Sequence, residues 1–160
     1  MFFVTFTESH VLIVADEPVS MIDVSLRTTI IDLMLDLRRE LGLTYLFITH
    51  DLAIAKYISD RIAIMYLGRI VEIGGKAEIF SRPMHPYTQA LLLAIPVPNP
   101  ERKRRIIELR GEVPSAIDIP KGCRFRTRCP CEQGICKQEE PELVAVSPGH
   151  FVACHSVEES

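Results

Sequence analysis

The chain has 160 residues, of which 48% are apolar, enough for one ordinary domain, or for one small domain with an appendage, around a real core. Its 18 basic and 21 acidic residues give a net charge of −3, which excludes a general electrostatic attraction to nucleic acid or acidic lipid. Its apolar runs are far shorter than the roughly 20 residues of a membrane-spanning helix, and "MFFVTFTESH" has neither the basic region nor the cleavage site of a secretion signal.

The first predicted element is a strand that ends in acidic residues. Residues 11–15 form a continuous apolar run, which is typical of a strand buried on both faces of a parallel sheet. Asp16 and Glu17 follow this run directly. The strand is therefore expected to carry two adjacent carboxylates to the edge of a sheet.

A helix and a second buried strand come next. Residues 24–41 carry apolar side chains at helical spacing, with Asp23 or Ser25 as the expected N-cap and Gly42 as the expected end. Residues 44–50 are rich in β-branched and aromatic residues and end on a polar histidine. Strand, helix and strand together predict a βαβ unit.

The following segment predicts a short helix and an antiparallel hairpin. The helix is expected over residues 52–58, and two strands within residues 61–75 are joined by a turn at Leu67 and Gly68, at the edge of the sheet. Further helical pieces are expected near residues 76–80 and 87–95. Pro86 suits the first position of the second of these helices.

The character of the chain changes near residues 96–100. Prolines become frequent, a charged run "ERKRR" follows, and every cysteine lies beyond this point. We therefore predict a boundary here, with residues 1–98 forming an α/β unit with a parallel sheet and a β-hairpin, and residues 99–160 forming a small irregular cysteine-rich extension.

The carboxylates and the histidine suit phosphoryl chemistry. Functional groups collect at the carboxyl edge of a parallel sheet, where Asp16, Glu17 and His50 are all expected. On a P-loop fold, the first acid helps to hold Mg²⁺, the second orients or deprotonates the attacking water, and a histidine contacts the γ-phosphate. Acidic residues after a strand can also simply begin a loop or cap a helix, and a histidine there is often without a chemical role. The prediction of phosphoryl chemistry therefore depends on the spacing of all three residues together.

Two long stretches carry a family resemblance. "LIVADEPVSMIDVS", followed after a helix by "LGLTYLFITHDLAIAKYISDRIAIMYLGRIVEIG", resembles the ATP-binding subunits of ABC transporters. Among these, the chain is most similar to the oligopeptide/dipeptide importer group with its nickel-importing relatives. "HPYT" at residues 85–88 is characteristic of this group, although its spacing implies no chemical role.

The resemblance implies roles for four residues. Asp16 matches the Walker B aspartate that holds Mg²⁺, and Glu17 matches the catalytic glutamate. Asp23 matches the D-loop aspartate that acts across the ATP-sandwich dimer, and His50 matches the switch histidine. Met21 stands where the family has a small residue, which weakens the match at Asp23.

The resemblance also implies a setting for the protein. The complete family member hydrolyses MgATP in the cytoplasm, peripherally on the inner face of the cell membrane, and drives uptake of dipeptides or oligopeptides, with nickel or other cargo open. Its implied partners are the transmembrane subunits, a second ATP-binding subunit and, indirectly, a solute-binding protein. No nucleic acid is expected.

The cysteines form a second group of candidate ligands. In a reducing cytosol, five cysteines are more consistent with thiols or metal ligands than with disulfides. The spacing C-x5-C-x6-C-x17-C is too long for a zinc knuckle and suits an iron–sulfur cluster, which some members of the resembling group carry. The four cysteines of this spacing are Cys123, Cys129, Cys136 and Cys154.

Alternatives stay open for this segment. Cys131 can substitute for Cys129, reduced thiols can pack as small apolar groups, and zinc can bind with Cys131 or His155 as a ligand. The neighbouring arginines, at positions 124, 126 and 128, can pair with a thiolate cluster or remain solvated. The chain as a whole can also be a non-catalytic metal-binding module associated with a transporter, or a non-functional gene fragment.

We predict negligible ATP affinity for these 160 residues alone. The sequence contains no G-x-x-x-x-G-K-[ST] loop and no "LSGGQ" signature, so Asp16 and Glu17 would face the triphosphate as anions facing an anion. Calorimetry with Mg²⁺ present measures this affinity. A dissociation constant in about the low micromolar range would contradict the prediction.

Overall fold

The fold is taken from a computed structural model of the chain. It describes residues 2–7, 10–95, 109, 111, 114–115 and 117–157, with side chains from Val11 onward. The contacts divide the chain into two compact units, residues 1–59 and 60–160. The predicted boundary at residues 96–100 lies outside the described residues, so the division into residues 1–98 and 99–160 stays a prediction.

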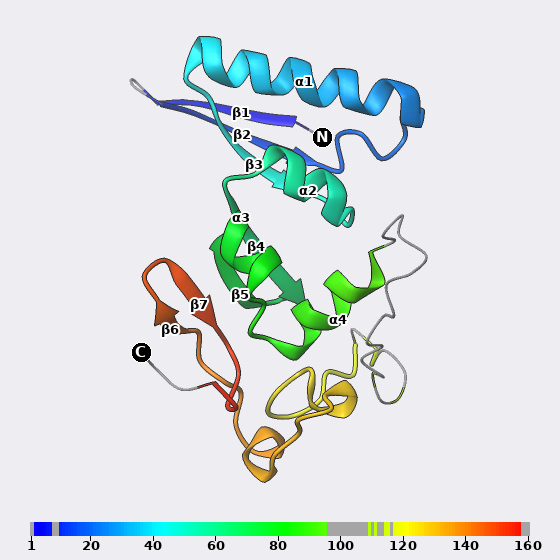
Figure 1. Ribbon diagram of the computed structural model, residues 1–160, viewed down its shortest axis with the longest axis vertical. Helices are drawn as coiled ribbons and strands as arrows, with labels where there is room; N and C mark the ends of the chain where they lie inside the picture. Colours follow the sequence, from blue (N-terminus) through cyan, green and yellow to red (C-terminus); the bar gives the residue numbers. More distant parts are fainter. Residues whose placement is uncertain are drawn as a thin grey trace. The chain divides into compact units, whose positions relative to one another are not determined.

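The first unit is a sheet with helices packed on one face. Its strands lie in the order β1-β2-β3 (Figure 1). β1 pairs with β2 antiparallel, whereas β2 and β3 are parallel. The elements are β1 (Phe2–Thr7), β2 (His10–Asp16), α1 (Val24–Leu41), β3 (Thr44–Ile48) and α2 (Leu52–Ile58).

These elements confirm the predicted βαβ unit and add one strand. The parallel register pairs Leu12 with Thr44 and Asp16 with Ile48. Gly42 ends α1 in the left-handed conformation, as expected, but Asp23 occupies the N-cap position without a side-chain hydrogen bond to the helix. β1 was not predicted, because the first ten residues match no recognised part of the family pattern.

The core of the first unit lies between the sheet and the two helices. Val19, Ile31 and Ile58 are buried together, and Phe47 of β3 packs against them. Strand residues alternate between the two faces of a sheet, so the face opposite this core carries Leu12 and Leu46. Asp16, at the end of β2, lies on that same face. Leu12 and Leu46 are 43% and 53% exposed.

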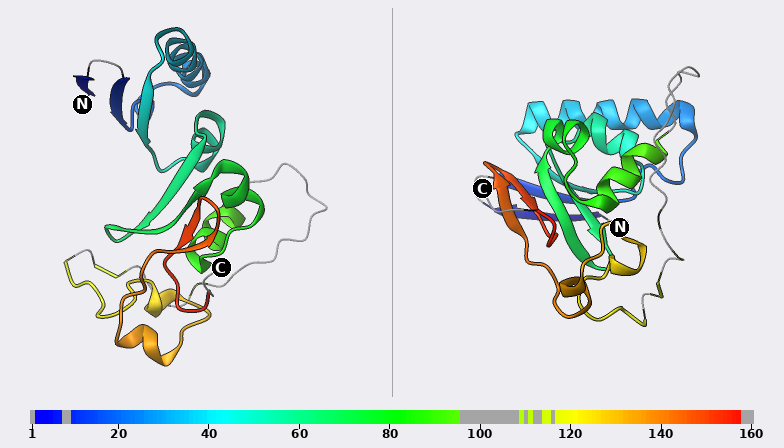
Figure 2. Two further views of the ribbon diagram at one scale, coloured as in Figure 1. Left: turned by 90° about the vertical axis from the view of Figure 1, so that its left-hand side faces the viewer. Right: turned by 60° about the horizontal axis from the view of Figure 1, so that its bottom comes forward.

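The second unit contains an antiparallel sheet, with strands in the order β4-β5-β7-β6 (Figure 2). The predicted hairpin is confirmed, but its partners are the C-terminal strands rather than the parallel sheet. The strands are β4 (Arg61–Tyr66), β5 (Arg69–Gly75), β6 (Val144–Ser147) and β7 (His150–Val152). Short helices are α3 (Lys76–Ser81), α4 (Pro86–Ala94), η1 (Arg126–Arg128) and η2 (Gly134–Lys137).

The C-terminal segment is therefore less irregular than predicted. Residues 144–147 and 150–152 pair antiparallel around Pro148 and Gly149, and β7 extends the sheet of the predicted hairpin. The alternating apolar residues and the Pro-Gly turn are the sequence signals that would have predicted this hairpin. Among the described residues, no helix is both long and apolar enough to cross a membrane.

Gly122 fixes the crossing of two cysteine segments. It has a φ of +70°, and a Cβ atom there would lie 2.5 Å from the backbone oxygen of Cys136. The next residue, Cys123, donates its backbone N–H to the same oxygen at 2.9 Å. A side chain at position 122 therefore cannot fit without moving the backbone.

We predict that Gly122→Ala lowers the free energy of unfolding by roughly 3 kcal/mol, because it combines a backbone clash with a strained φ. Gly149→Ala is the matched control, since Gly149 has a φ of +78° but open space around its Cα. The control should cost only about 1 kcal/mol. Urea unfolding of both variants measures the difference, and equal losses would contradict the packing described here.

Candidate functional site

The candidate site lies where β2 and β3 end. Because the two strands are parallel, Asp16, Glu17 and His50 come to the same edge of the sheet. The Glu17 backbone N–H donates to the Ile48 carbonyl at 2.9 Å, which continues the pairing past the last residue of β2. The expectation that the acids and the histidine share one edge is therefore correct.

Glu17 has an unusual backbone conformation. Its φ is +48°, a left-handed value that costs free energy for a residue other than glycine. Ser20 holds this conformation, because its backbone N–H and its hydroxyl both donate to the Glu17 carbonyl, at 3.2 and 3.0 Å. The turn directs Glu17 toward the residues that follow β3.

His50 binds the Glu17 carboxylate twice. Its backbone N–H donates to Glu17 Oε1 at 3.1 Å, and its ring nitrogen Nδ1 lies 2.6 Å from the same oxygen. The hydrogen bond to Glu17, followed by the charge of that carboxylate, raises the pKa of His50. The His50 side chain is 80% exposed, so the pair is open to a ligand from solvent.

Asp16 and Asp23 are not part of this pair. Asp16 is exposed at the end of β2, and Asp23 is exposed at the start of α1. Neighbouring Asp51 caps α2, accepting from the backbone N–H groups of Ala53 and Ile54 at 2.8 and 3.2 Å. The structure therefore brings two of the four candidate residues, Glu17 and His50, into direct contact, and the residue after His50 caps α2.

The cysteines lie in one another's neighbourhood. Cys129 and Cys136 are buried, and Cys131 is exposed. Burial raises the pKa of the Cys129 thiol to about 11, and burial also raises the pKa of Cys123 and Cys154. The charge of Cys154 contributes to the raised pKa of both Cys123 and Cys129.

This neighbourhood does not form a site for a single metal ion. Within the described residues, no group of three or more His, Cys, Asp or Glu side chains is placed to hold one. One alternative from the sequence was that the arginines between the cysteines remain solvated, and this does not hold for Arg124. It is paired with Glu140 at 2.9 Å.

A buried carboxylate in the second unit was missed from the sequence. Glu72 of β5 is fully buried, and its carboxylate accepts from the backbone N–H groups of Met84 and His85 at 2.8 and 3.0 Å. Nε2 of His150 lies 2.7 Å from it. In β5, Glu72 stands between the apolar Val71 and Ile73, so alternation would have suggested that Glu72 faces solvent, and the sequence does not show which partners it meets.

His85, in the "HPYT" segment, caps α4. Its Nδ1 accepts the Tyr87 backbone N–H at 3.0 Å, with Pro86 at the first position of the helix as expected. Burial lowers the pKa of His85 to about 4, so the ring is neutral at physiological pH. The histidine therefore has a structural role that the spacing alone did not reveal.

Comparisons with known proteins show which family the chain resembles. The family description "Oligopeptide/dipeptide transporter, C-terminal region" matches residues 71–136. The chain is 53% identical to the oligopeptide transport ATP-binding protein AppF of Bacillus subtilis, across 90% of the chain and 44% of the relative. It is 52% identical to a putative peptide import ATP-binding protein of Brucella ovis, across 89% of the chain and 45% of the relative.

These matches indicate first a class and then a family. Over about 90% of its length the chain is similar to ATP-binding proteins of ABC transporters, such as a probable peptide ABC transporter ATP-binding protein of Sinorhizobium fredii, to which it is 49% identical. Within that class, residues 71–136 match the oligopeptide/dipeptide transporter family. The chain spans less than half the length of each of these relatives.

We predict that the His50 imidazole titrates above its ordinary pKa of about 6.5 and that Glu17→Gln brings the pKa down. The removed carboxylate is the largest cause of the upward shift. Because the folded-state pKa is raised, the ion pair is fully present below the ordinary pKa and is lost as pH rises through the folded value. An NMR titration of the His50 ring measures both variants, and an unchanged pKa in Glu17→Gln would contradict the pairing.

Proposed function

We propose that the chain contributes the hydrolytic part of an ATP-binding subunit that energises a peptide ABC importer. The observation that carries the proposal is the contact between Glu17 and His50 at the ends of two parallel strands. The relatives are named as ATP-binding proteins of peptide transport, which supports the same function. They favour it over a separate metal-binding module.

The proposed chemistry is attack of water on the γ-phosphate of MgATP. Asp16 would help to hold Mg²⁺, and Glu17 would accept the proton of the attacking water. His50 would contact the γ-phosphate, and a raised pKa favours the protonated ring that such a contact needs. The same histidine contacts the Glu17 carboxylate and would hold it in place. Asp23 would act across the interface of two ATP-binding subunits.

The proposal extends to the surroundings of the chain. The sheet of β2 and β3 would be part of a larger P-loop parallel sheet, and residues 99–160 would form the family's cysteine-rich extension. The partners would be two transmembrane subunits and a second ATP-binding subunit, with a solute-binding protein acting indirectly. The subunit would lie in the cytoplasm on the inner face of the membrane, and peptide would be the cargo.

We predict that a chimera supports this function. In it, the chain replaces the matching segment of AppF from Bacillus subtilis, which is 53% identical to it. The chimera should hydrolyse MgATP, and Glu17→Gln should lower kcat by at least about 100-fold while MgATP binding is retained, because only the proton acceptor is lost. Glu40→Gln, at an exposed position of α1, is the control. An active Glu17→Gln chimera would overturn the assignment.

We also propose that Cys123, Cys129, Cys136 and Cys154 hold an iron–sulfur cluster. The electrostatic influence of these thiols on one another supports a shared neighbourhood. A cluster contains several iron atoms, so its ligands are more widely spaced than those of one ion. This spacing is compatible with the absence of a single-ion site among the described residues. Binding would also have to overcome the raised thiol pKa values.

We predict iron and acid-labile sulfide in anaerobically purified protein. Both should be lost in Cys136→Ser, which removes a buried ligand, and retained in Cys131→Ser, which changes an exposed cysteine outside the proposed set. Chemical assays of iron and sulfide measure this. Protein that contains neither would contradict the cluster, whereas loss in Cys131→Ser would replace one ligand of the proposed set.

A further inference from the structure

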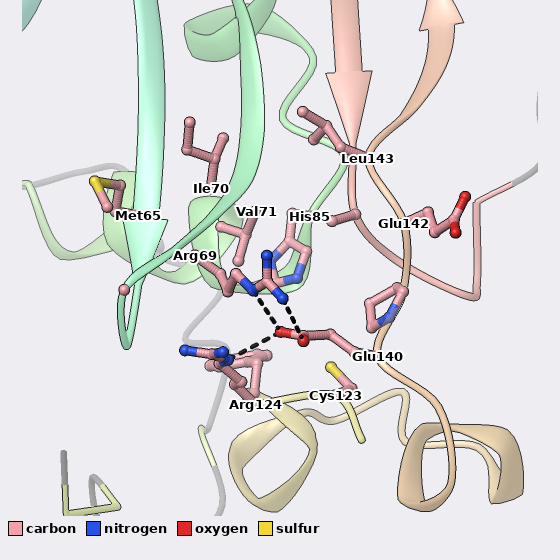
Figure 3. A pocket seen from close by; sticks show the side chains of 14 residues that line it. Met65, Arg69, Ile70, Val71, His85, Cys123, Arg124, Glu140, Glu142 and Leu143 are labelled. Carbon is pink, nitrogen blue, oxygen red and sulfur yellow. Dashed lines mark hydrogen bonds and ion pairs between the residues drawn. The ribbon is translucent and has the colours of Figure 1, made fainter. Parts of the chain in front are cut away.

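A cavity in the second unit takes no part in the proposed ATP chemistry, although Cys123, one of the proposed cluster ligands, lines its wall. It has a volume of about 700 Å³, within the range of small-molecule sites, and opens to solvent. It lies against the start of β5, the segment after Gly122 and the segment before β6 (Figure 3). All of these parts belong to one compact unit.

Two guanidinium groups share one carboxylate at this cavity. Arg69 donates to both oxygens of Glu140, through Nε at 3.2 Å and Nη2 at 3.0 Å. Arg124 donates to the same carboxylate through Nε at 2.9 Å, and through Nη1 to the Leu67 carbonyl. We call Arg69, Glu140 and Arg124 the arginine triad. Two positive charges and one negative charge leave the triad with a charge of +1.

The triad has hydrogen-bond donors to spare. Among the described residues, Arg69 Nη1 and Arg124 Nη2 have no hydrogen-bond partner, and the two side chains are 60% and 22% exposed. Another acid, Glu142, lines the cavity, but its carboxylate is directed away from the triad in Figure 3. The uncompensated charge and the free donors therefore favour an oxyanion, which guanidinium groups bind with two parallel hydrogen bonds.

Apolar side chains surround the triad. Met65, Ile70 and Leu143 line the cavity and are 59%, 39% and 42% exposed. Val71 and Phe125 form buried parts of the same wall. A ligand that contacts these residues needs an apolar body in addition to its anionic group.

We propose that this cavity binds a small carboxylate with an apolar body, and that its carboxylate competes with Glu140 for Arg69. The bidentate pair of Arg69 with Glu140 already has the geometry that such a ligand would adopt. Glu140 occupies this position on Arg69 in the structure, and an incoming carboxylate would displace it from Arg69 while Arg124 retains it. The site is independent of the proposed ATP chemistry, so either proposal can fail without the other.

Two kinds of compound fit this description of the ligand: an amino-acid derivative and a fatty acid. The probes are therefore N-acetylleucine, octanoate and N-acetylleucinamide. N-acetylleucinamide has the apolar side chain of N-acetylleucine but carries an amide in place of the carboxylate. The Nε–H signals of Arg69 and Arg124 in the NMR spectrum of the full chain report binding. Ligands of this size should bind in about the millimolar range.

We expect saturable shifts with one or both carboxylates and none with the amide. A response to N-acetylleucine alone identifies an amino-acid ligand, and a response to octanoate alone identifies a fatty acid. Each of these outcomes supports the proposal. Absence of a saturable response to both carboxylates, or equal responses to N-acetylleucine and its amide, would overturn it.

Three variants separate ligand binding from a structural effect. Arg69→Gln should weaken binding about tenfold, because a charge-assisted pair is lost. Glu140→Gln should strengthen it about tenfold, because the competing carboxylate is removed. Arg61→Gln removes the same charge from an exposed position of β4 outside the cavity and should change nothing.

Thermal unfolding of each variant checks that the fold is retained. If Glu140→Gln loosens the segment before β6, the comparison of Arg69→Gln with Arg61→Gln still decides the result. Equal affinities in these two variants would contradict the proposal, and so would weaker binding by a stably folded Glu140→Gln.

Discussion

The parallel pairing of β2 with β3 is the constraint on which the candidate site depends. It aligns Asp16 with Ile48, and the next hydrogen bond, from Glu17 to the Ile48 carbonyl, carries the alignment into the loop. His50 follows β3 by two residues and thereby reaches Glu17. A shift of one residue in this register would turn Glu17 to the other side and break the contact.

The backbone at Glu17 shows what this arrangement costs. A left-handed φ at a glutamate is unfavourable by roughly 1–3 kcal/mol, and it persists only where neighbouring contacts hold it. Here the contacts come from Ser20 and Ile48, on both sides of the turn. Strain of this kind concentrates at functional sites, which agrees with the role proposed for Glu17.

In the second unit, the buried carboxylate of Glu72 holds several elements together. It joins β5, the start of α4 and β7, because its partners are backbone N–H groups of residues 84 and 85 and the ring of His150. A buried acid without such partners would be strongly unfavourable. The "HPYT" segment is therefore tied to strands at both ends of the unit's sequence, and the arginine triad lies beside the same sheet.

Much of the local structure could be predicted from the sequence, because the deciding signals are local. The apolar run before Asp16, the helical spacing that ends at Gly42 and the turn at Gly68 each determine one element. The partners of the hairpin could not be predicted this way, since β7 joins β5 from more than 70 residues away. The same limit applies to Glu72 and His150, whose contact depends on strand order. It applies to the arginine triad as well.

The most direct test of the account is a crystal structure of the AppF chimera with Mg²⁺ and a non-hydrolysable ATP analogue. It measures the positions of the candidate side chains relative to the bound nucleotide. The account predicts Asp16 beside the Mg²⁺ ion, with Glu17 and His50 at the γ-phosphate, and with the Glu17 carboxylate facing the position of the attacking water. A nucleotide whose γ-phosphate lies away from the ends of β2 and β3 would contradict it.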